Sequence, residues 1–327
     1  MPIHHPCQLD PALATNLRWF QLLGVAPSTR RTYQAGINRY LQFCARYHLH
    51  PFPSSPLTLR YFAVHLADSV KHSTIKIYLC GLRLHHLELG FSNPTDDMLL
   101  QYVIKGIKRS QGEVWRPRFP ITMSILRQLK IQLHYCSELE FHDKRMLWAA
   151  FCLAFYGFLR SSEFVSPTPH SFDPSTTLLG SDITITRTTI SLTLKSSKTD
   201  PFRKGCTIYI GSTDTSTCPI SALRKYTNVT KTAPCEPLFQ FRDGSYLTRT
   251  ALTARLRALL TAAGHHPSSF SSHSFRIGAA STAADVGLPD WQIQTLGRWS
   301  SNCFTTYIRT DPRELAHASK QLATSTR

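Results

Sequence analysis

Apolar residues recur at helical spacing through the first third of the chain. After a polar start, one such pattern begins near Pro27, with apolar residues related by steps of three and four: Tyr33, Ile37, Tyr40, Leu41 and Cys44. Similar patterns follow at 58–70, 73–89 and 95–109. Ser73 and Thr95 are candidate N-caps, and Gly90 is a candidate helix stop. Residues 1–110 are therefore predicted to form a bundle of four or more helices.

A polar, basic segment, 110–120 (SQGEVWRPRFP), contains two prolines and is typical of an interdomain linker. We therefore expect three parts: an N-terminal helical domain at 1–110, a linker at 111–120 and a second domain at 121–327. Arg116 and Arg118 would suit a strand that lies along DNA phosphates. Simple solvation of a linker explains these two arginines equally well.

The pattern changes twice in the second domain. Helical spacing at 121–134 and 143–160 includes the most apolar run, 148–159 (WAAFCLAFYGFL), which is too short to span a bilayer and predicts a buried helix. Alternating, Ile- and Thr-rich segments then predict three short strands at 181–187, 189–194 and 206–210, the last two joined by a hairpin at 195–205. Helical patterns resume at 221–229, 248–263, 274–286 and 289–296, with short helices around Tyr307 and at 312–322. The fold class is mainly α (α+β), with a small antiparallel three-stranded sheet.

Charge narrows the choice of partner. Lys and Arg number 37 against 20 Asp and Glu, for a formal net charge of +17, which would draw the chain to a polyanion. Nucleic acid is favoured over a membrane surface, because no basic amphipathic helix stands beside an apolar anchor.

The cysteines give no sign of a metal or a disulfide framework. There are nine, with no C-x-x-C pair, and the chain has no secretory signal, so reduced intracellular thiols are expected. His4, His5 and Cys7 could be imagined as metal ligands, but a frayed terminus is the better interpretation. We expect no metal and no cofactor.

Cleavage of a phosphodiester without metal needs cations around the non-bridging oxygens, a nucleophile and an acid for the leaving oxygen. The sequence is poor in the convergent carboxylates that metal-dependent chemistry requires. The cationic and hydroxyl side chains that the metal-free reaction needs occur in four short segments: 157–163 (GFLRSSE), 195–200 (KSSKTD), 272–276 (SHSFR), and 296–299 (LGRW) with 305–309 (TTYIR).

An Arg, a hairpin Lys, a His-x-x-Arg, a Gly followed closely by Trp, and a Tyr in this order resemble the tyrosine recombinases, which include phage integrases and mobile-element recombinases. The resemblance runs from about Trp148 to Thr310. The N-terminal part resembles the family's SAM-like core-binding domain through its helix count and its T-x-x-T-Y run from Thr29 to Tyr33. The resemblance implies DNA recombination or integration through a 3′-phosphotyrosine intermediate. It also implies two domains that clamp double-stranded DNA, and a homotetramer on that DNA.

The same resemblance implies the roles of the central residues. Tyr307 would attack the scissile phosphate. Arg160 and Arg276 would bind the non-bridging oxygens, since a guanidinium matches phosphate geometry. Lys198 would be the acid for the 5′-hydroxyl leaving group, and His273 would assist proton transfer.

Two further positions are implied less directly. Glu163 matches an acid that orients the site. Trp299 is assigned the phosphate-facing aromatic position, although it stands eight residues before Tyr307 where the family pattern has nine; Arg298 is the alternative. Lys195 is the alternative to Lys198.

Each residue also has a structural explanation: Arg160 could complement a helix dipole, the lysines could form a solvated turn, and the aromatic residues could be core. Rival functions are a domesticated, non-catalytic DNA-binding protein, a type IB topoisomerase and a basic structural protein. The expected location is intracellular, with the DNA, and nuclear if the source is eukaryotic. The sequence does not specify the DNA site or distinguish integration from excision.

Overall fold

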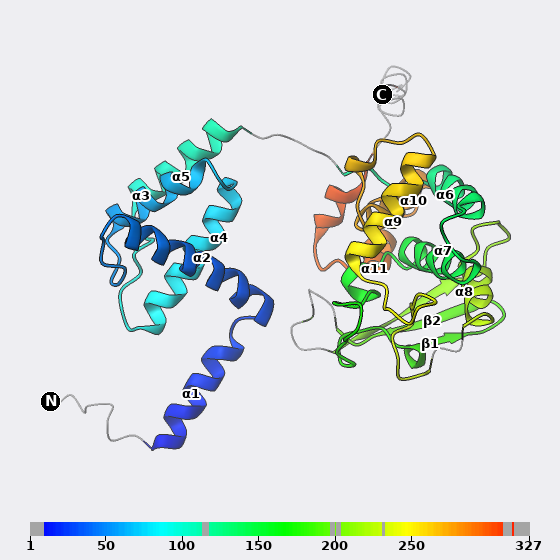
Figure 1. Ribbon diagram of the computed structural model, residues 1–327, viewed down its shortest axis with the longest axis horizontal. Coiled ribbons are helices and arrows are strands. Elements are labelled where there is room, and N and C mark those ends of the chain that lie inside the picture. Colours follow the sequence, from blue (N-terminus) through cyan, green and yellow to red (C-terminus); the bar gives the residue numbers. More distant parts are fainter. Residues whose placement is uncertain are drawn as a thin grey trace, which may run out of the picture. The chain divides into compact units, whose positions relative to one another are not determined.

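A computed structural model describes residues 10–112, 118–196, 200, 204–230, 233–309 and 316. The chain divides into two compact units, Met1–Trp115 and Arg116–Arg327 (Figure 1). Within the described residues, no helix is both long enough and apolar enough to cross a membrane.

The N-terminal unit is helical, as predicted. Its helices are α1 (Pro11–Leu23), α2 (Pro27–Arg46), α3 (Pro56–Ala67), α4 (His72–Glu88) and α5 (Met98–Gln111). Its core includes the rings of Tyr40 and Phe62, whose centroids lie 5.1 Å apart. Gly36 and Gly81 have no room for a Cβ, because Tyr78 and Tyr33 pack directly against them, and this lets α2 and α4 approach closely.

The helix starts differ from the prediction in three places. Residues 11–23 form α1, although the pattern there is not that of a buried helix. Ser73 lies inside α4, after an N-cap at Lys71. Thr95 bonds Asn93, and Asp97 caps α5 by accepting from the Leu100 amide (2.9 Å). The prediction of Gly90 as a stop is confirmed: it follows α4 with φ +81°.

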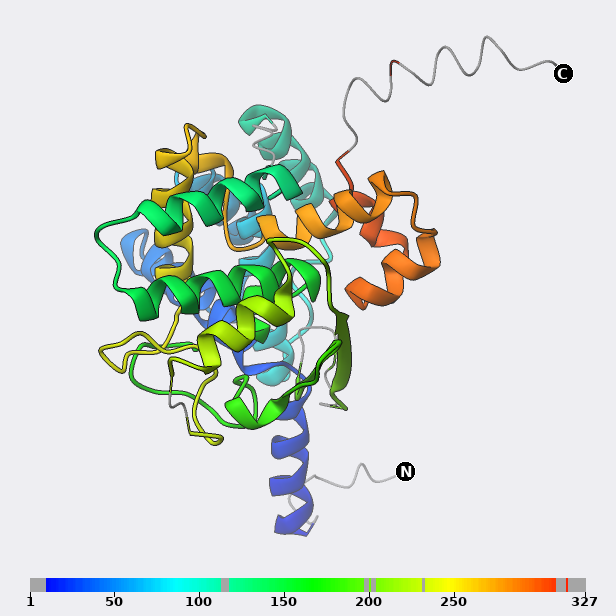
Figure 2. The same cartoon turned by 90° about the vertical axis from the view of Figure 1, so that its right-hand side faces the viewer.

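The second unit confirms a mainly helical fold with a small sheet (Figure 2). The strands β1 (Ile183–Ile185), β2 (Thr189–Leu194) and β3 (Cys206–Gly211) form an antiparallel sheet in that order, with Ile190 opposite Ile210. Around it are α6 (Met123–Tyr135), α7 (Phe141–Tyr156), α8 (Pro219–Thr227), α9 (Arg249–Ala262), α10 (Ser274–Asp285) and α11 (Asp290–Gly297). Residues 146–155 of α7 are all buried, as the apolar run predicts.

Helix α7 is shorter than predicted. It ends at Tyr156, because Gly157 caps it and Phe158 adopts a left-handed conformation (φ 49°). Arg160 therefore does not end the helix; it is the N-cap of the 3-10 helix Ser161–Glu163. The helix predicted at 312–322 falls outside the described residues, apart from Ala316.

Candidate active site

The turn after α7 places a buried carboxylate between two arginines. The Glu163 side chain is 1% exposed. Its Oε1 accepts from Nη1 of Arg160 (2.9 Å), and its Oε2 accepts from the Arg160 amide (2.9 Å) and from Nη2 of Arg298 (2.8 Å). Glu163 thus fixes both guanidinium groups and offsets part of their charge.

The Arg298 side chain links the end of α11 to the turn after α7 through hydrogen bonds. It follows α11 in the left-handed region (φ 56°), and this conformation turns its side chain back toward the α7 turn. Besides Glu163, its guanidinium donates to the carbonyls of Gly157 (3.0 Å), Leu296 (3.2 Å) and Phe158 (3.2 Å). These bonds occupy both terminal nitrogens, so the guanidinium group binds acceptors of the protein itself.

Arg276 lies at the centre of the cluster and is fully buried in α10. Its terminal nitrogens donate to the carbonyls of Phe158 and Gly297, and no described residue bonds its Nε. Burial, with the nearby charges of Arg160 and Arg298, lowers the pKa of Arg276 to about 10. The group is therefore still a cation at neutral pH.

Two aromatic rings cover Arg276. The Trp299 centroid lies 4.2 Å from the guanidinium carbon, and the Tyr307 centroid lies 5.8 Å from it. The two rings are 5.0 Å apart. Gly297 is required beneath Trp299, because a Cβ there would overlap the indole ring. The indole Nε1 is buried and has no hydrogen-bond partner among the described residues.

His273 is the N-cap residue of α10, and its ring centroid is 5.2 Å from that of Tyr307. Burial, and then the charges of Arg276, Arg160 and Arg249, lower the pKa of His273 to about 4. The imidazole is therefore neutral at neutral pH and can accept a proton.

Tyr307 ends the 3-10 helix Asn302–Tyr307 and is only partly buried. Ser281 of α10 fixes its backbone: the Ser281 hydroxyl donates to the Tyr307 carbonyl (3.3 Å) and accepts from the Arg309 amide (2.9 Å). No described residue hydrogen-bonds the Tyr307 hydroxyl.

Of the other predicted residues, Lys195 and Arg118 are described, and neither is part of this cluster. Lys198 and Arg116 lie outside the described residues. Lys195 forms an ion pair with Asp182 (2.7 Å) and donates to the Pro174 carbonyl (2.9 Å), which commits its ammonium group elsewhere. Arg118 donates to the Ser268 carbonyl (2.7 Å).

Three groups that contribute to the cluster were not predicted from the sequence. The Phe158 carbonyl accepts from both Arg276 and Arg298, but a backbone acceptor leaves no trace in a motif. Ser281 lies one helical turn beyond the His-x-x-Arg motif, and nothing local marks it. Arg249 begins α9 and adds positive charge near His273, although it lies 24 residues earlier in the chain.

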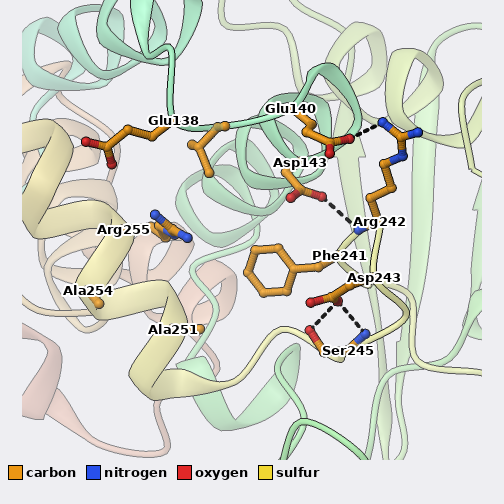
Figure 3. A pocket seen from close by; sticks show the side chains of 11 residues that line it. Glu138, Glu140, Asp143, Phe241, Arg242, Asp243, Ser245, Ala251, Ala254 and Arg255 are labelled. Atoms are coloured by element: carbon orange, nitrogen blue, oxygen red, sulfur yellow. Dashed lines mark hydrogen bonds and ion pairs between the residues drawn. The ribbon is translucent and has the colours of Figure 1, made fainter.

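No group of three or more His, Cys, Asp or Glu suited to a metal occurs among the described residues. A cavity of about 770 Å³ lies in the second unit, but none of the cluster residues lines it (Figure 3). Its walls include Glu140, which is ion-paired to Arg242, and Asp243, which accepts from Ser245. The arginine and aromatic cluster is therefore separate from this cavity.

Comparison with known proteins agrees with the geometry. No family model matches the chain. A protein from Selenomonas ruminantium described as an integrase/recombinase xerD homolog is 26% identical over 269 residues, which are 79% of this chain and 74% of the relative. By this measure the chain is similar to the tyrosine recombinases and integrases.

Solved structures of recombinases and integrases share the fold of this chain. XerH recombinase bound to difH DNA matches 89% of the chain and 78% of XerH, with a TM-score of 0.62 and 15% identity. The Tn1549 transposon integrase covers 89% of the chain and 98% of its own, with a TM-score of 0.56 and 13% identity. A lambda integrase dimer on a core site covers 92% and 82%, with a TM-score of 0.57 and 15% identity.

Proposed function

We propose that this protein is a recombinase that cleaves and rejoins DNA at specific sites through a 3′-phosphotyrosyl intermediate, with Tyr307 as the nucleophile. One observation carries the proposal: the fold gathers Arg160, His273, Arg276, Trp299 and Tyr307, from distant parts of the chain, into one cluster. The relative named as an integrase/recombinase, and the recombinase and integrase structures solved on DNA, support the same reaction.

In the proposed reaction, the Tyr307 oxygen attacks phosphorus and forms a new P–O bond, while the bond to the 5′ oxygen breaks. The tyrosine gives up a proton, and the 5′ oxygen gains one. His273, which is neutral at neutral pH and adjacent to the Tyr307 ring, assists the first transfer. Lys198 is proposed as the acid for the 5′ oxygen. Attack by another 5′-hydroxyl reverses these steps and releases the tyrosine.

Negative charge grows on the non-bridging oxygens, and Arg160 and Arg276 are proposed to bind them. The contacts of Trp299 and Arg298 favour Trp299 as the phosphate-facing residue. The Trp299 ring lies over the Arg276 guanidinium, and its indole N–H has no partner among the described residues, while Arg298 is bonded to Glu163 and to carbonyls. Arg298 and Glu163 are positioning residues in this proposal.

Double-stranded DNA is the proposed partner, which agrees with the net charge of +17. The N-terminal unit is proposed as the core-binding domain, and the second unit as the catalytic domain. Recombination joins two duplexes, so a homotetramer on DNA is the proposed working form. No metal or cofactor is proposed.

The test is covalent trapping on nicked duplexes from the DNA that flanks the gene, with Tyr307→Phe as the variant. Wild type should form a denaturation-resistant adduct, and the variant should bind the same DNA without forming it. Tyr135→Phe is the matched control, because Tyr135 is 76% exposed and belongs to no part of the cluster.

A randomised duplex pool removes dependence on the chosen flank. An adduct that persists in Tyr307→Phe would contradict the assigned nucleophile. Salt-sensitive binding by wild type with no adduct on the flanks or on the pool would favour a non-catalytic DNA-binding protein. Relaxation of supercoiled DNA without strand exchange would favour a topoisomerase.

A further inference from the structure

Helix α9 begins with a cation to which the reaction above gives no role. The chain has no aspartate or glutamate between Thr248 and Gly264, which includes the whole of α9. Arg249 is the first residue of the helix and is exposed, and no described residue bonds its side chain. Its positive charge is therefore not offset by a carboxylate of its own helix.

Backbone bonds fix the start of α9 beside the turn that carries Arg160. The Ser166 amide donates to the Leu247 carbonyl (2.9 Å), and Ser166 pairs with Thr248 in a short parallel bridge. Ser166 lies only six residues after Arg160, and Arg249 directly follows Thr248. These bonds therefore hold the Arg249 backbone close to the Arg160 turn.

The same helix is also bonded to the loop that leads to His273. Two turns after Arg249, the Nε of Arg257 donates to the Phe270 carbonyl (3.2 Å), three residues before His273. Burial, and then the charges of three arginines, lower the pKa of His273, and Arg249 is one of the three. Two independent observations, the backbone bonds and this electrostatic effect, thus place the Arg249 charge beside the cluster.

Arg249 differs from the other cations near the cluster in what surrounds it. The guanidinium groups of Arg160 and Arg298 form ion pairs with Glu163, and Arg276 is fully buried. Arg249 is exposed, and none of its hydrogen-bond donors is used by a described residue. An anion can therefore bind it without displacing any partner in the described part of the chain.

We propose that Arg249 binds the DNA backbone at a phosphate next to the scissile one. Each nucleotide of a strand carries one phosphate, so a cation beside the cluster meets a neighbouring phosphate when the cluster holds the scissile one. A guanidinium donates two parallel hydrogen bonds to such a group. The contact positions the duplex and reads no bases. This role rests on the proposed function, because it requires the scissile phosphate to lie in the cluster.

The salt dependence of DNA binding tests whether Arg249 contacts a phosphate. Fluorescence anisotropy is measured for the full-length protein on two duplexes of unrelated sequence. Arg249→Ala should weaken binding to both duplexes by the same factor, and it should reduce the slope of log affinity against log salt by about one. Arg255→Ala is the matched control, because Arg255 lies on the same helix but lines the separate cavity of Figure 3. An unchanged slope, or a loss on one sequence alone, would overturn the proposal.

Neutral phosphates locate the contact. In the trapping experiment, one phosphate at a time near the cleavage site is replaced by an uncharged methylphosphonate, and the rate of adduct formation is measured. Arg249→Ala should slow the reaction on unmodified DNA about tenfold, as expected when charge-assisted hydrogen bonds are lost. The difference between wild type and variant should disappear only when a phosphate adjacent to the scissile one is neutral. A difference that persists on every duplex, or that disappears at a distant phosphate, would contradict the assignment.

Failure of the proposed function gives a different result. If wild type forms no adduct on any duplex, the reaction itself is wrong, and a reduced salt slope would then show a DNA contact with no scissile phosphate beside it. If wild type forms the adduct and Arg249→Ala does so at the same rate, only the role of Arg249 is wrong.

A third measurement needs no DNA. The His273 imidazole lies near the charges of Arg276, Arg160 and Arg249 and against the Tyr307 ring. Because a nearby cation disfavours its protonation, Arg249→Ala should raise the midpoint of its NMR titration, and Arg255→Ala should not. An unchanged midpoint in Arg249→Ala would mean that this arginine lies away from the cluster, which would overturn its placement.

Discussion

At the scale of single residues, the cluster depends on one carboxylate. Glu163→Gln removes the negative charge that faces Arg160 and Arg298, and leaves these two guanidiniums close to Arg276. Breaking a buried ion pair from one side typically costs about 3 kcal/mol or more. We expect the free energy of unfolding to fall by about 3 kcal/mol, measured by urea denaturation.

Glu138→Gln is the control for that substitution. Glu138 is exposed, and it has no hydrogen bond or ion pair with a described residue. An exposed carboxylate of this kind changes stability by about 0.5 kcal/mol or less. If the two variants lose equal stability, Glu163 does not hold the cluster together.

His273 should make the stability of the protein depend on pH. Its pKa is about 4 in the folded chain, below the ordinary value of 6.5, because burial and nearby arginines disfavour its charged form. Between these values the unfolded state binds more protons, so stability rises with pH. The contribution is fully present above pH 6.5 and is lost as the pH falls toward 4.

Urea denaturation between pH 4 and 7 checks this expectation, with His273→Gln as the variant. The variant should show a shallower rise of stability with pH than wild type does. A titration of the His273 imidazole by NMR in free protein should give a midpoint near 4. A midpoint near 6.5 would mean that the ring is open to solvent and that the arginines do not act on it.

At the scale of elements, α5 offers a test of helix capping. The Asp97 side chain accepts from the Leu100 amide (2.9 Å) and forms an ion pair with Arg60 (3.1 Å). Asp97→Ala removes both interactions and should cost about 1–2 kcal/mol of unfolding free energy. Asp97→Asn keeps the capping oxygen and loses only the ion pair, so about 1 kcal/mol or less is expected. Urea denaturation of both variants compares the two effects. If both variants lose the same free energy of unfolding, the ion pair and not the capping bond accounts for the loss.

Capping also explains which element boundaries the sequence could predict. Gly90 was found because a left-handed residue after a helix favours glycine. The end of α7 was missed because Phe158, a bulky residue, adopts the left-handed conformation. The predicted strand boundaries lie close to the observed ones, because β2 buries every second residue: Ile190, Leu192 and Leu194. Local signals thus locate elements well and their ends less well.

At the scale of the whole molecule, the net charge of +17 predicts salt-sensitive binding to DNA. Each neutralised phosphate releases counterions, so the logarithm of the binding constant falls linearly with the logarithm of salt concentration. If about six phosphates are contacted, affinity for a random duplex should fall about a thousandfold between 50 and 200 mM salt. Fluorescence anisotropy measures this slope, and binding that does not change with salt would contradict an electrostatic DNA contact.

By itself, the sequence determined the class of the fold and the chemical identities in the candidate site. Helical and strand periodicities are local, so two runs of helices and a three-stranded sheet follow from them. The order of Arg, His-x-x-Arg, Trp and Tyr was likewise readable along the chain, and the resemblance to recombinases rested on it.

Only the tertiary structure decided what each of these residues contacts. The sequence left Arg298 and Trp299 as alternatives, because they are neighbours in a single motif. The fold separates them: a left-handed Arg298 turns toward Glu163, and Trp299 packs over Arg276 on the α-carbon of Gly297. Carbonyl acceptors and ring contacts join segments more than a hundred residues apart, and no local pattern records such distances.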